Sequence, residues 1–203
     1  MDNYSEIIRL MRDYETTVVL GSGFYKELGY YPYHDYQPYR YNSINKEKII
    51  AADINWGYKC KDIVVDATRT LQIIEALYDH GLIDHLIDVS PYCLTKCYLG
   101  EHVLCLLHDD EDEKLPTIGS CLSYGKYRDA LLDLMASDTI IIMGILPYLS
   151  PINTMVVVPK IKDARLIVVD SSYNPYCEIA DICVSQSIIG FLRNIHEYLG
   201  VSL

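Results

Sequence analysis

The sequence predicts an α/β fold of three layers, in which a parallel sheet lies between two layers of helices. Two apolar, β-branched runs, Thr139–Met143 and Leu166–Val169, have the length of strands and do not alternate apolar with polar residues. Such strands are buried on both faces, which is typical of a parallel sheet covered by helices. Segments with helical periodicity separate the strand-like runs along the chain, as the connections of a parallel sheet require.

Size and composition suit one globular domain. The chain has 203 residues, half of them apolar, so we expect residues 1–203 to form a single domain with its own core. The net charge of −11, without a run of basic residues, argues against nucleic-acid or anionic-membrane binding. No apolar run reaches the ~18 residues of a membrane span. An acidic chain can attract a basic partner such as a lysine-bearing peptide, although solubility alone explains the charge as well.

The cysteine pattern predicts reduced thiols. Seven cysteines, an odd number, follow no secretory signal, which indicates a cytoplasmic protein. They do not form two Cys-x-x-Cys pairs, so we expect no zinc or other metal site. The seven are Cys60, Cys93, Cys97, Cys105, Cys121, Cys177 and Cys183.

The first strand runs into a glycine-rich turn. Residues 3–14 predict an amphipathic helix and Thr16–Leu20 a strand, which leads into Gly21-Ser22-Gly23. A strand followed by Gly-x-Gly at a helix start is the diphosphate-binding geometry of Rossmann-like sheets, because the glycines admit the phosphates and helix N–H groups meet their charge. A third glycine, Gly29, comes late. We therefore predict a nucleotide cradle here.

A tyrosine-rich loop follows the glycine turn. Residues 25–41 contain seven tyrosines. Tyrosine offers a large contact area at a low entropic cost, so this loop can stack on a ring or contact a partner protein. It can equally pack on its own domain, and the sequence does not decide between these roles.

The middle of the chain continues the alternation of helices and strands. Asp62–Tyr78 has apolar residues at a period near 3.6 and predicts a helix. His85–Val89 and His102–His108 predict the next two strands. Lys126–Met135 predicts the helix before the strand that begins at Thr139.

The connection between the two apolar strands is ambiguous by propensity. Ser150-Pro151 is typical of a helix start, but Met155–Val158 favours a strand. We predict a short helix ending near Pro159–Lys162, because two parallel strands need a crossover and crossovers are usually helical. Glu178–Val184 and Ile188–Leu199 predict the last strand and the last helix.

Two further candidate site residues lie at strand ends. Gly144 follows the strand Thr139–Met143, and Asp170 follows Leu166–Val169. Ligands of open α/β sheets bind beyond the carboxyl ends of the strands. Gly144 would admit a ligand close to the backbone, and Asp170 could accept hydrogen bonds from the hydroxyls of a ribose.

The order of these motifs resembles the sirtuins, a family of NAD-dependent protein deacylases. Gly21, Gly23 and Gly29 fit the spacing of the family's glycine motif, and His108 stands where sirtuins have their catalytic histidine. Asp170 stands where the family has an Asn on the adenosine ribose. The resemblance implies the Rossmann-like fold that sirtuins share with deoxyhypusine synthase, with NAD or ADP-ribose as the ligand.

The sequence also departs from the sirtuin pattern. The stretch from Asp88 to Tyr92 occupies the place of Thr-Gln-Asn-Ile-Asp, so that Ser90 replaces the Asn and Tyr92 the Asp. Between His108 and Thr139 there is no counterpart of the family's two Cys-x-x-Cys pairs. We therefore expect one sirtuin-like domain without a zinc-binding subdomain.

These observations predict a divergent sirtuin-like protein that binds NAD or ADP-ribose and has weak or no deacylase activity. Whether it is an enzyme is left open. One alternative is a sirtuin-related NAD hydrolase or deacylase that uses His108 as its catalytic residue. Another is a non-catalytic module that contacts a protein through the tyrosine-rich loop 25–41. The predicted nucleotide contacts are Gly21, Ser22, Gly23, Gly29, Ser90, Gly144 and Asp170.

Overall fold

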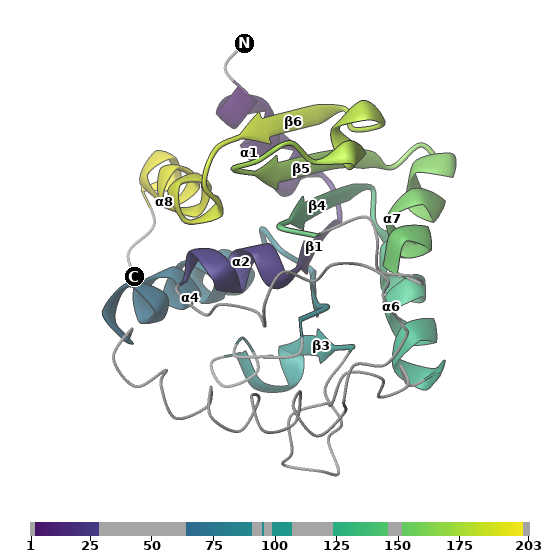
Figure 1. Cartoon of the computed structure of the whole chain (residues 1–203), viewed down its shortest axis with the longest axis horizontal. Helices are drawn as coiled ribbons and strands as arrows, with labels where there is room; N and C mark the ends of the chain where they lie inside the picture. Colours follow the sequence, from purple (N-terminus) through teal and green to yellow (C-terminus); the bar gives the residue numbers. More distant parts are fainter. Residues whose placement is uncertain are drawn as a thin grey trace, which may run out of the picture.

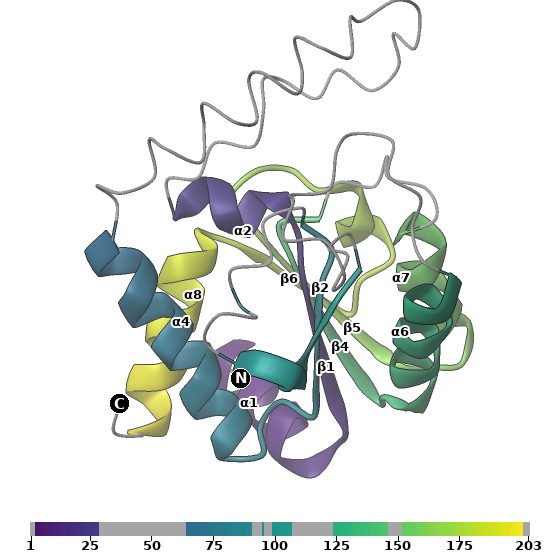
Figure 2. The same ribbon diagram turned by 90° about the horizontal axis from the view of Figure 1, so that it is seen from below.

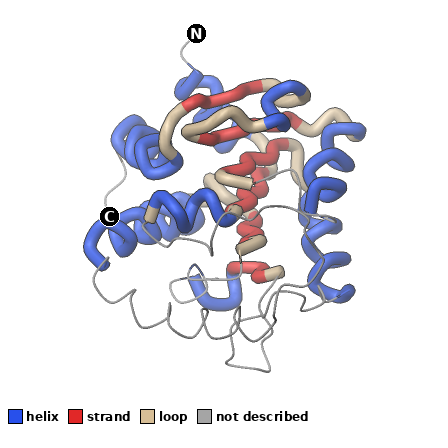
Figure 3. Tube along the Cα trace, in the orientation of Figure 1, coloured by secondary structure: helices blue, strands red, loops and turns tan. Residues whose placement is uncertain are grey.

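Six strands form one sheet, in the order β3-β2-β1-β4-β5-β6 (Figures 1 and 3). Every neighbouring pair of strands is parallel, as predicted. The strands are β1 (Thr16–Leu20), β2 (His85–Asp88), β3 (Val103–Cys105), β4 (Thr139–Met143), β5 (Arg165–Asp170) and β6 (Ile182–Ser185). This computed structural model describes residues 3–28, 64–90, 95, 99–106, 124–145 and 152–200.

Helices cover both faces of the sheet (Figures 1 and 2). One face carries α1 (Asn3–Asp13), α2 (Ser22–Glu27), α4 (Val64–Asp79) and α8 (Ile188–Leu199). The other carries α6 (Tyr124–Ala136) and α7 (Ile152–Ile161). Two short 3-10 turns, η2 (Gly100–His102) and η3 (Pro175–Glu178), precede β3 and β6. Within the described ranges, no helix has the length and hydropathy needed to cross a bilayer.

The central strands β1, β4 and β5 have no solvent-exposed face because each one contributes to two cores. Along β4, Ile141 and Met143 pack with the α1, α2, α4 and α8 layer. The alternate residues Ile140 and Ile142 pack with α6 and α7. All four are at most 1% exposed. The uniform apolar pattern therefore follows from the side-chain period of two combined with helices on both faces.

The helix α7 forms against its local propensity. Its valine-rich interior favours a strand, yet Val156 packs into the core shared by α6 and α7. The helix returns the chain from the end of β4 to the edge of the sheet where β4 begins, so that β5 can pair with β4 in parallel. Burial of an apolar face and the need for a crossover outweigh propensity, as predicted.

Two predicted strands are shorter than expected. The strand expected over 102–108 is β3, Val103–Cys105, because its partner β2 offers only Leu86–Asp88 for pairing. The strand expected from Glu178 begins at Ile182 instead. Residues 175–178 form η3, which Asn174 caps by accepting a hydrogen bond from the Tyr176 N–H.

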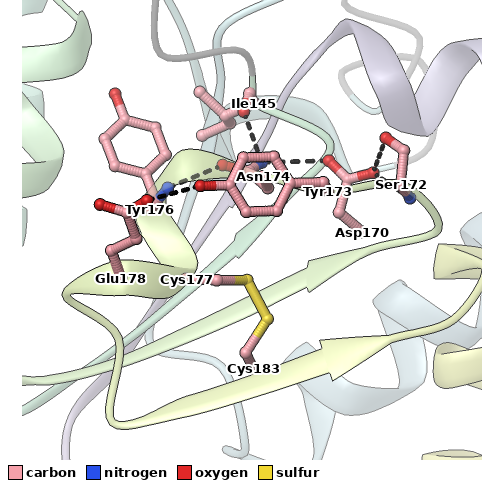
Figure 4. The surroundings of a disulfide bond; sticks show 9 residues. All are labelled: Ile145, Asp170, Ser172, Tyr173, Asn174, Tyr176, Cys177, Glu178 and Cys183. Atoms are coloured by element: carbon pink, nitrogen blue, oxygen red, sulfur yellow. Dashed lines mark hydrogen bonds between the residues drawn. A yellow bond between two sulfur atoms is a disulfide. The ribbon is translucent and has the colours of Figure 1, made fainter.

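The expectation of reduced thiols is wrong for three cysteines. Cys177 in η3 and Cys183 in β6 are joined by a disulfide, with their Cα atoms 5.4 Å apart (Figure 4). Cys105 is disulfide-bonded as well. The cysteine count therefore no longer supports a reducing compartment, because proximity in the fold decides which thiols can pair.

Candidate functional site

The sheet changes its direction of growth between β1 and β4. From β1 the chain adds β2 and β3 on one side, and then β4, β5 and β6 on the other. In open α/β sheets, ligands bind at such a switch point, beyond the carboxyl ends of the strands. The turn after β1 carries Gly21, Ser22 and Gly23, and the turn after β4 carries Gly144 and Ile145. The candidate site is built around these two turns.

The two turns are packed backbone against backbone. The Gly21 N–H donates to the Met143 carbonyl and the Gly23 N–H donates to the Gly144 carbonyl, each at 2.9 Å. A Cβ added to Gly21 would lie 2.4 Å from the Gly144 oxygen, and one added to Gly144 would lie 2.5 Å from the Phe24 nitrogen. Gly144 also has a φ of +64°. We call Gly21, Gly23 and Gly144 the glycine junction, and its close contacts require the absence of side chains.

The hydrogen bonds of the glycine junction make two of its N–H groups unavailable to a phosphate. Two of the amides that were predicted to meet a phosphate, those of Gly21 and Gly23, already donate to the end of β4. Ser22 lies between them, at the start of α2, and is half-buried. The bulky Phe24 and Tyr25 do not fill the turn, since both are buried in the core on the α8 side of the sheet.

On the β2 side of the junction lies a buried carboxylate, Asp88. Its oxygens accept hydrogen bonds from the Tyr25 hydroxyl, from Thr95 Oγ1 at 2.7 Å and from the Ser90 N–H at 2.8 Å. Asp88, Ser90 and Thr95 are completely buried. We call Tyr25, Asp88, Ser90 and Thr95 the Asp88 cluster. It ties α2, which follows the glycine turn, to the end of β2 and the residues after it.

Burial governs the protonation chemistry of the Asp88 cluster. It raises the pKa of Asp88 above its ordinary value, although the hydrogen bonds from Tyr25, Thr95 and Ser90 oppose the rise. Burial, and then the neighbouring Asp88 charge, raise the pKa of Tyr25 well above its ordinary value. Tyr25 therefore acts as a neutral hydrogen-bond donor at physiological pH.

Ser90 is placed differently from its expected role. The sequence predicted a contact with the ligand, at the position of the sirtuin Asn. Its N–H and its hydroxyl both bond to Asp88, and the residue has no exposed surface. Its hydrogen-bonding groups are therefore used inside the protein.

On the β5 side, Asp170 organises the turn that follows its strand (Figure 4). One oxygen, Oδ1, accepts hydrogen bonds from the Ser172 N–H at 2.9 Å and the Ser172 hydroxyl at 2.8 Å. The other, Oδ2, accepts from Asn174 Nδ2 at 3.0 Å. Since a carboxylate offers about four acceptor positions, one position of the half-buried Asp170 has no donor among the described residues. Asp170 can thus accept from one ribose hydroxyl rather than from two.

Asn174 is a site residue that the sequence reasoning missed. Its side chain is 1% exposed, and Nδ2 donates both to Asp170 and, at 2.9 Å, to the Ile145 carbonyl. It thereby joins the turn after β5 to the turn after β4. The available signal was an Asn directly before a proline, which is typical of the cap of a short helix.

The structure thus brings most of the predicted nucleotide contacts to one edge of the sheet. Gly21 and Gly23 contact Gly144 directly, and Ser22 lies between them in the sequence. Asn174 joins Asp170 to Ile145, the residue after Gly144. Gly29, His108 and the tyrosine-rich loop beyond Leu28 lie outside the described residues. Two cavities that described residues line are elsewhere, one between α4 and α8 and one beside β3. The described part of the chain holds no group of three or more His, Cys, Asp or Glu that could hold a metal ion.

Comparison with known sequences gives one partial match. No family model matches the chain. A segment of 78 residues, 38% of this chain, is 31% identical to an NAD-dependent protein deacetylase of Oceanobacillus iheyensis. That segment spans 33% of the relative's length. The sequence match is therefore local and does not extend over the relative as a whole.

Comparison with solved structures covers nearly the whole chain. A Sir2 complex with a p53 peptide and NAD+ matches 97% of this chain and 98% of its own, with a TM-score of 0.73 at 16% identity. Sir2Tm bound to a propionylated peptide matches 100% of both chains, again with a TM-score of 0.73 at 16% identity. A Sir2 variant with deacetylated p53 peptide and 3'-O-acetyl ADP ribose gives the same score and identity. The chain has a sirtuin-like fold, as its motifs predicted.

The glycine junction should be sensitive to a single methyl group. We expect Gly144→Ala to lower the free energy of unfolding by about 2–5 kcal/mol, since it adds a steric clash with fixed backbone to the cost of a positive φ. Gly81→Ala is the matched control, because Gly81 has φ +66° but nothing within 4 Å of an added Cβ. It should lose only about 1 kcal/mol. Urea unfolding measures both, and equal losses would contradict the role of the junction.

The Asp88 cluster should make stability depend on pH. The pKa of Asp88 is higher in the folded protein than its ordinary value of 3.8, so the folded state favours the protonated carboxyl. This contribution to the free energy of unfolding is fully present below pH 3.8, and it is lost as pH rises through the raised pKa. Asp88→Asn cannot lose a proton, so the variant should gain stability relative to wild type as pH rises from about 4 to 7. Urea unfolding at several pH values checks this.

Asp181 provides a control of opposite sign for that experiment. Partial burial alone would raise its pKa, but the hydrogen bonds from Lys160 and the Leu166 N–H outweigh it, so the pKa is lowered. The contribution of Asp181 to the free energy of unfolding is present above its ordinary pKa of 3.8 and is lost as pH falls through the lowered pKa. Asp181→Asn should therefore lose stability relative to wild type as pH rises. If Asp88→Asn instead loses stability as pH rises, as Asp181→Asn should, the assignment of Asp88 is wrong.

Proposed function

We propose that this chain is a divergent sirtuin-like protein that binds NAD or ADP-ribose at the carboxyl edge of its sheet. The observation that carries the proposal is the position of the glycine junction. It lies at the switch point between β1 and β4, with Asp170 and Asn174 beside it. Solved structures of the same fold contain NAD+ or acetyl ADP ribose.

The described residues suit the ribose end of such a ligand better than its diphosphate. Asp170 is half-buried and has one acceptor position that no described residue fills, so a ribose hydroxyl can donate to it. Asn174 fixes the carboxylate in place. The Gly21 and Gly23 amides are already bonded, which leaves fewer N–H groups to meet the phosphates than a Rossmann-like turn usually offers. We therefore expect affinity to depend mainly on the β5 side of the site.

The same reasoning argues against efficient deacylation. Sirtuins have an Asn and an Asp after the strand that corresponds to β2, whereas this chain has Ser90 and Tyr92. The hydrogen-bonding groups of Ser90 are occupied by Asp88, and a tyrosine carries no carboxylate charge near neutral pH. Loss of one such polar group commonly costs about 10²–10³ in rate. His108 alone would then support little deacylation.

The binding proposal predicts a specific loss of affinity. We expect calorimetry to detect ADP-ribose binding by the wild type, and Asp170→Ala to weaken it about ten-fold or more, since a hydrogen bond to a charged acceptor is removed. Ser172→Ala is the matched control, because it deletes one of the contacts within the turn and leaves the open acceptor position intact. It should change the affinity by less than about three-fold. The absence of binding at millimolar NAD and ADP-ribose would refute the proposal and favour a protein-interaction module acting through loop 25–41.

The catalytic proposal is tested by incubating the protein with NAD and an acetyl-lysine peptide. We expect little deacetylated peptide, and any slow release of nicotinamide should be independent of the peptide and abolished by His108→Ala. That outcome would assign residual activity to NAD hydrolysis, in which water replaces the peptide as acceptor. Efficient, peptide-dependent release of nicotinamide that requires His108 would instead show a deacylase.

A further inference from the structure

A cavity of about 310 Å³ lies between α4 and α8, on a helical layer rather than at the edge of the sheet. Figure 2 shows the two helices side by side. Their facing surfaces contribute Ile73 on one side and Phe191 and Ile195 on the other to the same buried core. Ile73 also lines the cavity. The cavity thus lies next to the buried contact between the two helices.

Its polar lining follows from helical spacing. Arg69 lies four residues before Ile73, so both project from one face of α4. On α8, Arg193 is followed by His196 and Glu197 at three and four residues, which places all three on a second common face. Packing of the two faces brings together two guanidinium groups, an imidazole and one carboxylate, from positions 69 and 193–197 of the sequence.

The cavity is positively charged on a strongly acidic protein. Two arginines face one carboxylate there, whereas the whole chain carries a net charge of −11. The Arg69 guanidinium has no hydrogen bond or ion pair with another described residue, while Arg193 has a further interaction of its own. Arginine cannot ligate a cation, but its planar fork of donors matches the oxygens of phosphates and carboxylates.

His196 supplies an independent indication of a ligand. Its Nε2 atom is buried, and no partner for it is found among the described residues. Leaving a buried polar atom without a partner is unfavourable, so such an atom calls for an ion or a water molecule that completes its hydrogen bonding. His196 also lines the cavity beside the two guanidinium groups, so a turn of its ring would bring this atom to an oxyanion that can accept from it.

From these features we infer that the α4–α8 cavity binds a small phosphate-bearing anion, through Arg69, Arg193 and His196. This site is separate from the proposed nucleotide site and does not rest on it. The Glu197 carboxylate opposes the anion and limits its affinity. Ile73 provides an apolar floor, which suits a phosphate ester as well as free phosphate.

The inference is tested with inorganic phosphate as the probe. Protein labelled with ¹⁵N-histidine is titrated with phosphate at constant ionic strength, and the His196 imidazole resonance is identified by its loss in His196→Gln. We expect a saturable shift of this resonance. Arg69→Gln should weaken phosphate binding about ten-fold or more, because a charge-assisted contact is lost. Arg128→Gln is the matched control, as Arg128 is exposed on α6, on the opposite face of the sheet, and should have no effect.

A variant that binds phosphate more tightly is also needed, because a loss of binding can result from unfolding. Glu197→Gln removes the opposing charge, so it should bind phosphate several-fold more tightly. Asp170→Ala should leave the titration unchanged, which separates this cavity from the proposed nucleotide site. A linear, non-saturating shift, or equal weakening by Arg69→Gln and Arg128→Gln, would overturn the inference.

Two further probes identify the source of the phosphate. If AMP shifts the His196 resonance at lower concentration than phosphate does, the ligand is a phosphate ester, and if the two are equal, phosphate itself is sufficient. Both results support an anion site. Equal binding of adenosine and AMP would contradict it, because adenosine carries no negative charge.

Discussion

The close contact between the turns after β1 and β4 is the constraint on which the rest of the candidate site depends. Two hydrogen bonds of 2.9 Å join these turns, and a Cβ on any of the three glycines would lie within 3 Å of the opposite backbone. Because backbone cannot yield as a flexible side chain can, the two central strands must end at the same level. The position of every other group at this edge is set relative to that contact.

Polar side chains extend the contact to the neighbouring strands. On one side the buried Asp88 holds Tyr25 of α2, so the helix that begins at the glycine turn is fixed to the end of β2. On the other side Asn174 spans from Asp170 to the carbonyl of Ile145. Four successive strand ends are thereby connected. Several groups that the sequence predicted as ligand contacts, among them the Gly21 and Gly23 amides and Ser90, are bonded within the protein.

The fold and the use of individual polar groups are separate matters in this chain. The sirtuin-like arrangement is supported over nearly the whole chain at 16% identity. It depends on glycines, apolar strands and crossovers, which place few demands on particular polar side chains. Ser90, which the sequence predicted as a ligand contact, is buried after β2 and bonded to Asp88 instead. A shared fold therefore does not by itself imply a shared reaction.

The sequence by itself determined the layers and most of the strands. A strand with both faces buried needs apolar residues at nearly every position, as in Thr139–Met143. This pattern can be recognised in the sequence alone. It also located the glycines and Asp170, because strand ends are visible in the pattern. Three features were decided only by the tertiary structure: the Cys177–Cys183 bond, the burial of Ser90, and the placement of Arg69 and His196 around one cavity. Such contacts depend on the register and packing of whole elements, which no local pattern encodes.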